Sequence, residues 1–570
     1  LLLATSPVIE AAKRAKRSGD GQQKYRKHKE LQFEGDRSVD EYLGIPFAEP
    51  PLNDKRFMPP QEYENKPTNR SPFQASTPAR TCPQDLFQTG IHALDFWNPP
   101  KDTISEDCLQ LNMWVPANTT GAVLVNLCGG AYWRLGASAD IFNGSALAAY
   151  SGAIVVNLNF RLGALGFARS KNSSIYGNMG LLDQQMGLQW IKENIKDFGG
   201  DPEKVTLMGE QTGASSAQAH LYAKNSTGLF KRIALTSGVL ENPWASRSNR
   251  FEEKATEMLA SLLNCTTTNK NQKVDLACLQ KKHYTEILNA TATVKKSSGL
   301  TFGFPFSLIF KDKEFFDKNI TREQPNVQDV DILMGNTKDE GSFFLWYYFN
   351  KTANCDLKMK AQPMTGSCSV SESAFNTIVQ NVTDIFGKEK SWQDKVKEYY
   401  YRSETNRTKV TEKFLADILF DCGLKQFADN ITDNKKDGSY VYEFRHRSNE
   451  KSTTWPESFG TVHAALIEFL FGRPFRYPDH YDNEKLGKEK EMSQKVMELY
   501  GKFAKDGKPA DNWEPYKQND KKVMILNSNF NVSSSSQTYK TSAYGDNCDW
   551  LINRFEQEVR MPKKPGKKQQ

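Results

Sequence analysis

The chain has 570 residues, of which 38% are hydrophobic and 25% are charged, a composition typical of soluble globular proteins. No run of about 18 apolar residues occurs, so the sequence predicts no transmembrane helix. The net charge of +7 arises at the ends, because residues 1–30 and residues 560–570 each contribute +5; the body carries −3, and nothing in it resembles a nucleic-acid-binding module.

The two ends are predicted to be extensions of a single domain that spans residues 31–556. Residues 1–30 open with Leu1-Leu2-Leu3, which is typical of the end of the apolar region of a signal peptide. The stretch Arg14–Arg17 that follows has two interpretations, a processing site for secretory proteases and a disordered basic arm, and the sequence leaves both open. Residues 557–570 are predicted to form a basic, disordered tail.

Strand and helix patterns alternate between residues 120 and 223. Buried strands read as continuous apolar runs, whereas helices show apolar residues at a spacing of three and four. Such alternation predicts an α/β fold with a mostly parallel, twisted sheet and helices on both faces, and residues 491–504 predict a later amphipathic helix. The predicted strands cover 122–127, 153–158 and 205–208, and the predicted helices cover 181–195 and 214–223.

Acceptor sequences for N-linked glycans occur along the whole chain. Any one Asn-x-Ser/Thr triplet is weak, but thirteen of them indicate a heavily glycosylated, secreted protein. The triplets begin at Asn69, Asn118, Asn143, Asn172, Asn225, Asn264, Asn289, Asn319, Asn350, Asn381, Asn406, Asn430 and Asn531.

The segment Gly209–Gly213 follows the third predicted strand and precedes a helix. A strand, a residue set among glycines and a helix form the layout of a nucleophile elbow, where side chains at the glycine positions would clash with neighbouring strands. At this point the chain resembles the type-B carboxylesterase/cholinesterase family, which implies an α/β-hydrolase fold over residues 31–556. Four further blocks carry the resemblance, namely Leu43–Ala48, Ser105–Asn112, Gly335–Phe344 and Val462–Gly472.

One position departs from the family pattern. In ester hydrolysis by this family, a serine hydroxyl attacks the ester carbonyl, a histidine takes the proton of the serine and a carboxylate orients the histidine. The resemblance places these three groups at Gln211, His463 and Glu340. An amide is not a usable nucleophile because its nitrogen lone pair is delocalised, and Ser215 and Ser216 lie a turn further along the helix. We therefore expect a pseudoenzyme, with the three residues as the remnant of a triad.

The surroundings of the triad are expected to persist. The resemblance assigns a remnant oxyanion hole to the backbone N–H groups of Gly129, Gly130 and Thr212. Cys128 is expected to be a small buried thiol behind this loop. The Gln211 amide is expected to hydrogen-bond the imidazole, so that the buried polar cluster stays satisfied.

An aromatic pocket is the second feature that the resemblance implies. In cholinesterases a tryptophan at the position of Trp97 stacks on a quaternary ammonium group, so an organic cation is the expected ligand. The alternative is that these aromatic side chains only form core. The residues expected to line the pocket are Trp97, Tyr132, Glu210, Trp244, Phe302, Phe304, Phe343 and Phe344.

Eight of the nine cysteines are predicted to form disulfides. Cys265/Cys278 and Cys355/Cys368 each enclose a short polar loop, as local bridges do. The resemblance implies the bridges Cys82–Cys108, Cys265–Cys278 and Cys422–Cys548, and it leaves Cys128 unpaired.

Relatives without the serine, such as neuroligin-like adhesion proteins and the C-terminal domain of thyroglobulin, use this fold for contacts. The leading hypothesis is therefore a secreted, non-catalytic glycoprotein that binds an extracellular protein or a small ligand and needs no cofactor or metal. The alternatives are a carrier for an organic cation and an active ester hydrolase with a non-standard nucleophile. A homodimer is predicted through C-terminal helices, from the apolar face Met492, Val496, Leu499, Tyr500 and Phe503 and from Cys548–Phe555.

Overall fold

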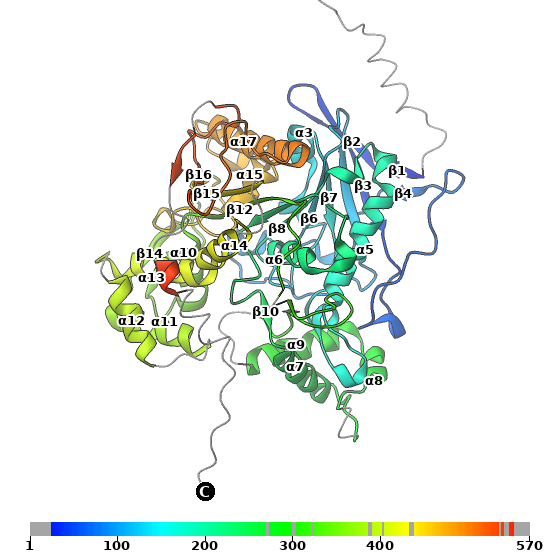
Figure 1. Cartoon of the computed structure of the whole chain (residues 1–570), viewed down its shortest axis with the longest axis horizontal. Helices are drawn as coiled ribbons and strands as arrows, with labels where there is room; N and C mark the ends of the chain where they lie inside the picture. The colour runs from blue at the N-terminus through cyan, green and yellow to red at the C-terminus, as the bar shows by residue number, and fades with distance from the viewer. Residues whose placement is uncertain are drawn as a thin grey trace, which may run out of the picture.

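A computed structural model of the chain describes residues 24–268, 273–298, 304–320, 323–385, 390–401, 404–432, 438–534, 537–540 and 547–551. Its centre is a twisted sheet of eleven strands, seen in Figure 1. Neighbouring strands from β16 to β7 are parallel, whereas antiparallel pairs form both edges. In spatial order the strands are β17 (Tyr539–Lys540), β16 (Val523–Leu526), β15 (Ser439–Phe444), β12 (Asp331–Thr337), β9 (Arg232–Thr236), β8 (Val205–Glu210), β6 (Val123–Leu127), β7 (Ile154–Leu158), β5 (Gln110–Pro116), β3 (Arg37–Pro46) and β2 (Lys29–Phe33).

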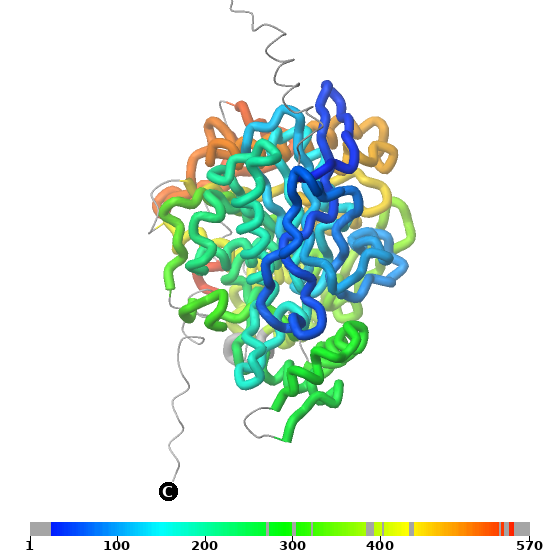
Figure 2. The backbone as a smooth tube through the Cα atoms, turned by 90° about the vertical axis from the view of Figure 1, so that its right-hand side faces the viewer, coloured from blue at the N-terminus to red at the C-terminus, as the bar shows by residue number. Residues whose placement is uncertain are grey.

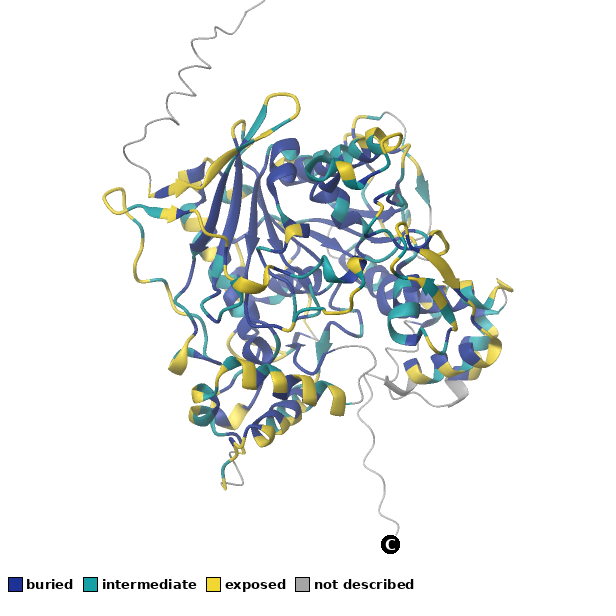
Figure 3. Ribbon diagram, turned by 180° about the vertical axis from the view of Figure 1, so that it is seen from behind, coloured by how far each residue is buried: buried dark blue, intermediate teal, exposed yellow. Residues whose placement is uncertain are grey.

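The central strands are buried on both faces. All five residues of β6 are buried; Val123 and Val125 pack into the core on one face and Leu124 into the core on the other. A parallel strand covered on both sides needs such a nearly continuous apolar run, which Asn126 interrupts in β6. Figure 3 shows the central strands in dark blue, while exposed residues gather on outer helices, turns and edge strands. The predicted mostly parallel sheet with helices on both faces is confirmed.

Helices cover the two faces of the sheet in separate layers. α3 (Ser145–Ser151), α15 (Ala465–Leu470) and α17 (Leu486–Asp506) share one core, and α5 (Met179–Asn194) and α6 (Thr212–Ala219) belong to the other. Within the described residues, no helix combines the length and apolar character that a membrane crossing requires. The longer helices beyond the two layers are α7 (Asn249–Leu262), α8 (Leu276–Lys281), α9 (Tyr284–Ser297), α10 (Glu340–Phe349), α11 (Glu372–Ile385), α12 (Lys390–Tyr400), α13 (Arg407–Ala416) and α14 (Cys422–Thr432).

The strands and helices predicted between residues 120 and 223 are present, whereas α3 and α4 (Gly163–Phe167) in the same range were not predicted. The bounds of β6, β7 and α5 agree with the prediction within two residues, and those of β8 and α6 differ at their ends. β8 extends to Glu210, and α6 starts at Thr212 and ends at Ala219, where a 3₁₀ turn takes over. The N-terminal boundary also moves, because β1 (Tyr25–Lys27) pairs with β4 (Phe73–Ala75). The fold therefore starts before residue 31, and Figure 2 shows these first strands in dark blue on the near side of the body.

The apolar face of α17 packs inside the chain. Its five predicted interface residues belong to the same core as α3 and α15. The prediction that this face is free to pair with a second copy is therefore wrong, because an amphipathic pattern shows that one face is covered but not what covers it. The predicted helix at Cys548–Phe555 lies mostly outside the described residues. The exposed fractions are Met492 2%, Val496 0%, Leu499 0%, Tyr500 1% and Phe503 0%.

Four disulfides join the chain, and Cys128 is free and buried. They are the four bridges expected from the sequence. Asp417 lies beside Cys422 and Cys548, but those two sulfurs are bonded to each other, so the group is not a metal site. The bridges are Cys82–Cys108, Cys265–Cys278, Cys355–Cys368 and Cys422–Cys548.

Candidate functional site

Gln211 occupies the sharp turn between β8 and α6. Its backbone has φ 51° and ψ −113°, a conformation that residues other than glycine rarely adopt. Segments of the chain pass so close together at this turn that only glycine fits at two neighbouring positions. A Cβ at Gly213 would lie 2.1 Å from the carbonyl oxygen of Leu127, and a Cβ at Gly238 would lie 2.2 Å from the carbonyl oxygen of Gln211. The geometry of a nucleophile elbow is thus present, with an amide in place of the nucleophile.

His463 and Glu340 meet beside this turn, although 123 positions separate them in the sequence. His463 Nδ1 lies 2.6 Å from Glu340 Oε2. The other oxygen of Glu340 accepts the Ser237 hydroxyl at 2.6 Å and the Thr337 backbone N–H at 2.8 Å. This carboxylate is completely buried, and its three partners fix its orientation.

The second imidazole nitrogen faces Glu210. Glu210 Oε1 lies 2.9 Å from His463 Nε2. The hydrogen bond expected between the Gln211 amide and this imidazole is absent among the described contacts, and Nε2 has the Glu210 carboxylate as an ion-pair partner instead. The reason is geometric: as the last residue of β8, Glu210 lies beside the imidazole, whereas the elbow turns the backbone of Gln211 out of the strand.

Two carboxylates around one imidazole change its charge. Burial alone would lower the pKa of His463, but Glu340 and Glu210 outweigh burial and raise it to about 10. Burial raises the pKa of Glu210, and the imidazolium opposes that change. The two carboxylates therefore favour the protonated imidazole, and only the neutral form of His463 can act as a general base.

Thr212 fills the predicted oxyanion hole with its own hydroxyl. Its Oγ1 accepts the backbone N–H of Gly130 at 3.1 Å and that of Tyr132 at 3.3 Å. An oxyanion hole works because its donors are free to bind the developing negative charge. Gly129 keeps its close approach, since a Cβ there would lie 1.7 Å from Glu210 O. The loop is therefore in place, but Gly130, one of its predicted donors, is already used.

The two neighbouring serines and the free thiol are all buried side chains. Ser215 is buried and shares a hydrogen bond of 2.8 Å with the Tyr132 hydroxyl. Ser216 is also buried, one turn into α6. Cys128 accepts a hydrogen bond from Asn126, and burial raises the pKa of its thiol, so the reactive thiolate is disfavoured.

The aromatic residues predicted to line one pocket are dispersed. Phe343 and Phe344 do lie against the imidazole, with ring centroids 6.4 and 5.0 Å from that of His463. The indole of Trp244 donates to the Leu419 carbonyl within the core, and Phe304 stacks on Trp133. Tyr132 is 1% exposed and belongs to the core, and Phe302 lies outside the described residues.

A cavity of about 60 Å³ opens between Trp97 and His463. Of the predicted ligand-binding residues that the structure describes, only Trp97 lines it. Trp455, Arg447 and Arg473 are among the lining residues that were not predicted, because no motif distinguishes them in the sequence. Their one common signal is position, since they flank the block that contains His463.

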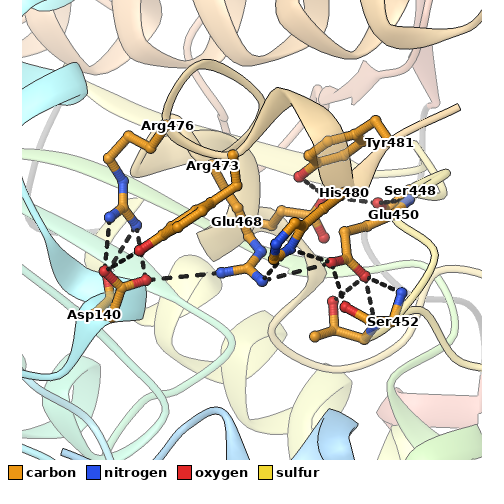
Figure 4. A network of polar contacts seen from close by, with 11 residues as sticks. Asp140, Ser448, Glu450, Ser452, Glu468, Arg473, Arg476, His480 and Tyr481 are labelled. Atoms are coloured by element: carbon orange, nitrogen blue, oxygen red, sulfur yellow. Dashed lines mark hydrogen bonds and ion pairs between the residues drawn. The ribbon is translucent and has the colours of Figure 1, made fainter. Parts of the chain in front are cut away.

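Arg473, which is itself buried, belongs to an ionic network at the wall of this cavity (Figure 4). Its guanidinium lies 3.5 Å from Glu450 and 3.7 Å from Asp140. A further lining residue, Glu468, accepts the hydroxyls of Ser448 and Tyr481, each at 2.6 Å. Burial raises the pKa of Glu468 to about 7. The cavity wall therefore contains ionic side chains as well as the two tryptophans.

The sequence of the chain matches the pattern of the carboxylesterase family over residues 27–545. It is 31% identical to "Acetylcholinesterase 4" of Caenorhabditis briggsae over 530 residues, which cover 87% of this chain and 84% of that protein. It is 34% identical to "Acetylcholinesterase" of Bungarus fasciatus over 516 residues, 86% of this chain and 80% of that protein. It is 31% identical to "Acetylcholinesterase" of Danio rerio over 545 residues, 86% of this chain and 82% of that protein.

Proposed function

The chain belongs to the carboxylesterase family and has its α/β-hydrolase fold, and we propose that it is a member that binds ligands without hydrolysing them. The observation that carries the proposal is Gln211 at the elbow, where an intact His463–Glu340 pair faces a side chain that cannot attack an ester. Two further features support the same conclusion. The Thr212 hydroxyl accepts the Gly130 N–H, which is an expected oxyanion donor, and the raised pKa of His463 favours the protonated imidazole.

The test of this proposal is ester hydrolysis by the purified protein. Choline and naphthyl esters should be hydrolysed no faster than by the heat-denatured protein. Loss of a triad nucleophile leaves about 10³–10⁴-fold acceleration over water in enzymes whose oxyanion hole is free. With the Gly130 donor engaged by Thr212, even this residual rate should be small. Turnover above the denatured control would overturn the proposal and favour the non-standard nucleophile.

The site of action in this proposal is outside the cell. Four disulfides support an oxidising compartment. The glycan sequons support it as well, since eleven of the thirteen asparagines are exposed and the other two, Asn143 and Asn350, are partly exposed. Treatment with a glycosidase should lower the mass of the secreted protein by many glycan units; an unchanged mass would contradict the glycoprotein part of the proposal.

Binding to a protein partner, including a second copy of the chain, remains part of the proposal, but not through the apolar face of α17. The largest exposed apolar side chains among the described residues are Leu52, Met258 and Leu262. Met258 and Leu262 lie four positions apart on α7, so they share one face of that helix. Sedimentation of the purified protein at micromolar concentration would decide between monomer and homodimer.

A further inference from the structure

The cavity beside Trp97 contains hydrogen-bond donors that have no acceptor. The Nε groups of Arg447 and Arg473 are buried and form no hydrogen bond with any described residue. The hydroxyl oxygen of Thr454 is buried and without a partner in the same way. All three residues line the cavity. Buried polar groups are nearly always satisfied, so three such groups at one cavity indicate a missing acceptor.

The charges at the cavity wall show what kind of acceptor is missing. Arg447 donates to the Trp455 carbonyl at 3.0 Å, and it forms no ion pair with a carboxylate among the described residues. Glu468 is held by two hydroxyls rather than by a cation, and His463 lies between two carboxylates of its own. Arg447 therefore places a positive charge at this cavity that no carboxylate among the described residues pairs with.

A cation is disfavoured by the same arrangement. The ring of Phe96, which lies 5.3 Å from that of Trp97, already has the Arg473 guanidinium over it at 5.2 Å. An ammonium ligand at Trp97 would therefore approach two guanidinium groups. The one carboxylate expected to attract such a cation, Glu210, is engaged by His463. The aromatic wall persists, but the Arg447 guanidinium at the same cavity repels a cation.

We infer that this cavity binds the carboxylate of a small organic anion, with the Arg447 guanidinium and the Thr454 hydroxyl as donors and Trp97 and Trp455 as the apolar walls. The assignment rests on the proposed binding function and names its ligand class. A cavity of about 60 Å³ corresponds to roughly four water molecules at about 15 Å³ each, so the enclosed part accommodates an anion with about four or five non-hydrogen atoms. Charge-assisted hydrogen bonds from arginine are the strong contacts that such a carboxylate needs.

Two probes of equal size and opposite charge test this inference. Propionate and tetramethylammonium each have five non-hydrogen atoms, and saturation-transfer NMR detects the binding of either at millimolar concentration and constant ionic strength. Propionate should bind and tetramethylammonium should not. Preferential binding of tetramethylammonium, or binding of neither probe, would overturn the inference.

Substitutions test whether propionate gives its NMR signal by binding in this cavity. Arg447→Gln should weaken propionate binding at least about tenfold, because it removes the unpaired charge. Arg250→Gln, which removes the same charge from an exposed position on α7, should leave binding unchanged. If Arg447→Gln lowers the melting temperature too far for measurement, Thr454→Val removes one donor at nearly constant shape and should weaken binding several-fold. Equal effects of Arg447→Gln and Arg250→Gln would overturn the assignment to this cavity.

The result of the propionate experiment can be distinguished from the result of the ester-hydrolysis experiment. Ester turnover would overturn the non-catalytic function whatever propionate does. Failure of propionate to bind, in a protein that hydrolyses no ester, would remove the ligand class and leave the non-catalytic function in place.

Discussion

The hydroxyl oxygen of Thr212 accepts the backbone N–H of Gly130 at a distance of 3.1 Å. Gly130 is one of the donors that family resemblance assigns to the oxyanion hole, and Thr212 directly follows the position of the lost nucleophile. In the proposed function, the adjacent side chains Gln211 and Thr212 thus remove two separate requirements of ester hydrolysis, the attacking group and one stabiliser of the anion.

The first prediction concerns the restoration of activity. From the sequence alone, Gln211→Ser would be expected to recover up to about 10³-fold or more. The structure changes this expectation, because removal of one oxyanion donor costs about 10²–10³ in rate. Gln211→Ser alone should show little turnover of naphthyl acetate, and Gln211→Ser/Thr212→Ala should exceed it by about 10²-fold.

The matched control is Gln211→Ser/Thr212→Ser, which keeps a hydroxyl as the acceptor for Gly130 and should stay as slow as Gln211→Ser. Circular dichroism and melting temperature must show that all three variants are folded. Equal rates for the alanine and serine versions at position 212 would show that the hydroxyl does not block the oxyanion hole.

The second prediction concerns pH. A general base works only in its neutral form, and the pKa of His463 is raised to about 10 by Glu340 and Glu210. The rate of Gln211→Ser/Thr212→Ala should therefore keep rising through neutral pH toward pH 10. Adding Glu210→Gln removes one of the two carboxylates and should move that rise to lower pH. A plateau near pH 7 with Glu210 present would contradict the assigned charge of His463.

The third prediction concerns stability. Arg161 follows β7 and pairs with Asp183 of α5 at 2.6 Å, with side chains 3% and 0% exposed. Asp183→Asn leaves the guanidinium buried without its charge partner and should lower the free energy of unfolding by about 3–5 kcal/mol. Glu62→Gln breaks the exposed Lys66–Glu62 pair and should cost less than about 1 kcal/mol. Urea unfolding measures both, and similar losses would contradict the argument from burial.

The fourth prediction connects the cavity to pH. Burial raises the pKa of Glu468 to about 7; the Ser448 and Tyr481 hydroxyls oppose this shift, and the nearby carboxylates of Glu450 and Glu489 add to it. Because Glu468 is neutral below this value and negative above it, ionisation adds an anion to the cavity wall. Propionate binding should weaken as pH rises from 6 to 8. Glu468→Gln should remove this pH dependence, and a slope that persists in Glu468→Gln would assign it to another group.

Much of the fold could be predicted from the sequence because its signals are local. The mostly apolar run of β6 requires a strand buried on both faces, and the glycines around Gln211 require a tight turn after β8. The role of the α17 face could not be predicted, since the pattern of a helix packed on its own chain equals that of a helix at an interface.

The site was only partly predictable because its decisive contacts depend on side-chain direction. The chain order of Gln211, Glu340 and His463 indicated the triad. Nothing in the order indicated that the Thr212 hydroxyl would turn toward Gly130. It could also not be predicted from the sequence that Arg447 and Trp97 line one cavity, because 350 positions separate them and only the fold places them together.

The most direct test of the non-catalytic function is covalent labelling with a serine-directed fluorophosphonate. The purified protein is incubated with the probe, and the peptide that contains Gln211 is examined by mass spectrometry beside Gln211→Ser/Thr212→Ala as a positive control. The account predicts no adduct on any residue of the elbow in the natural protein and an adduct on the serine of the variant. An adduct on the natural elbow, at Thr212, Ser215 or Ser216, would contradict the account.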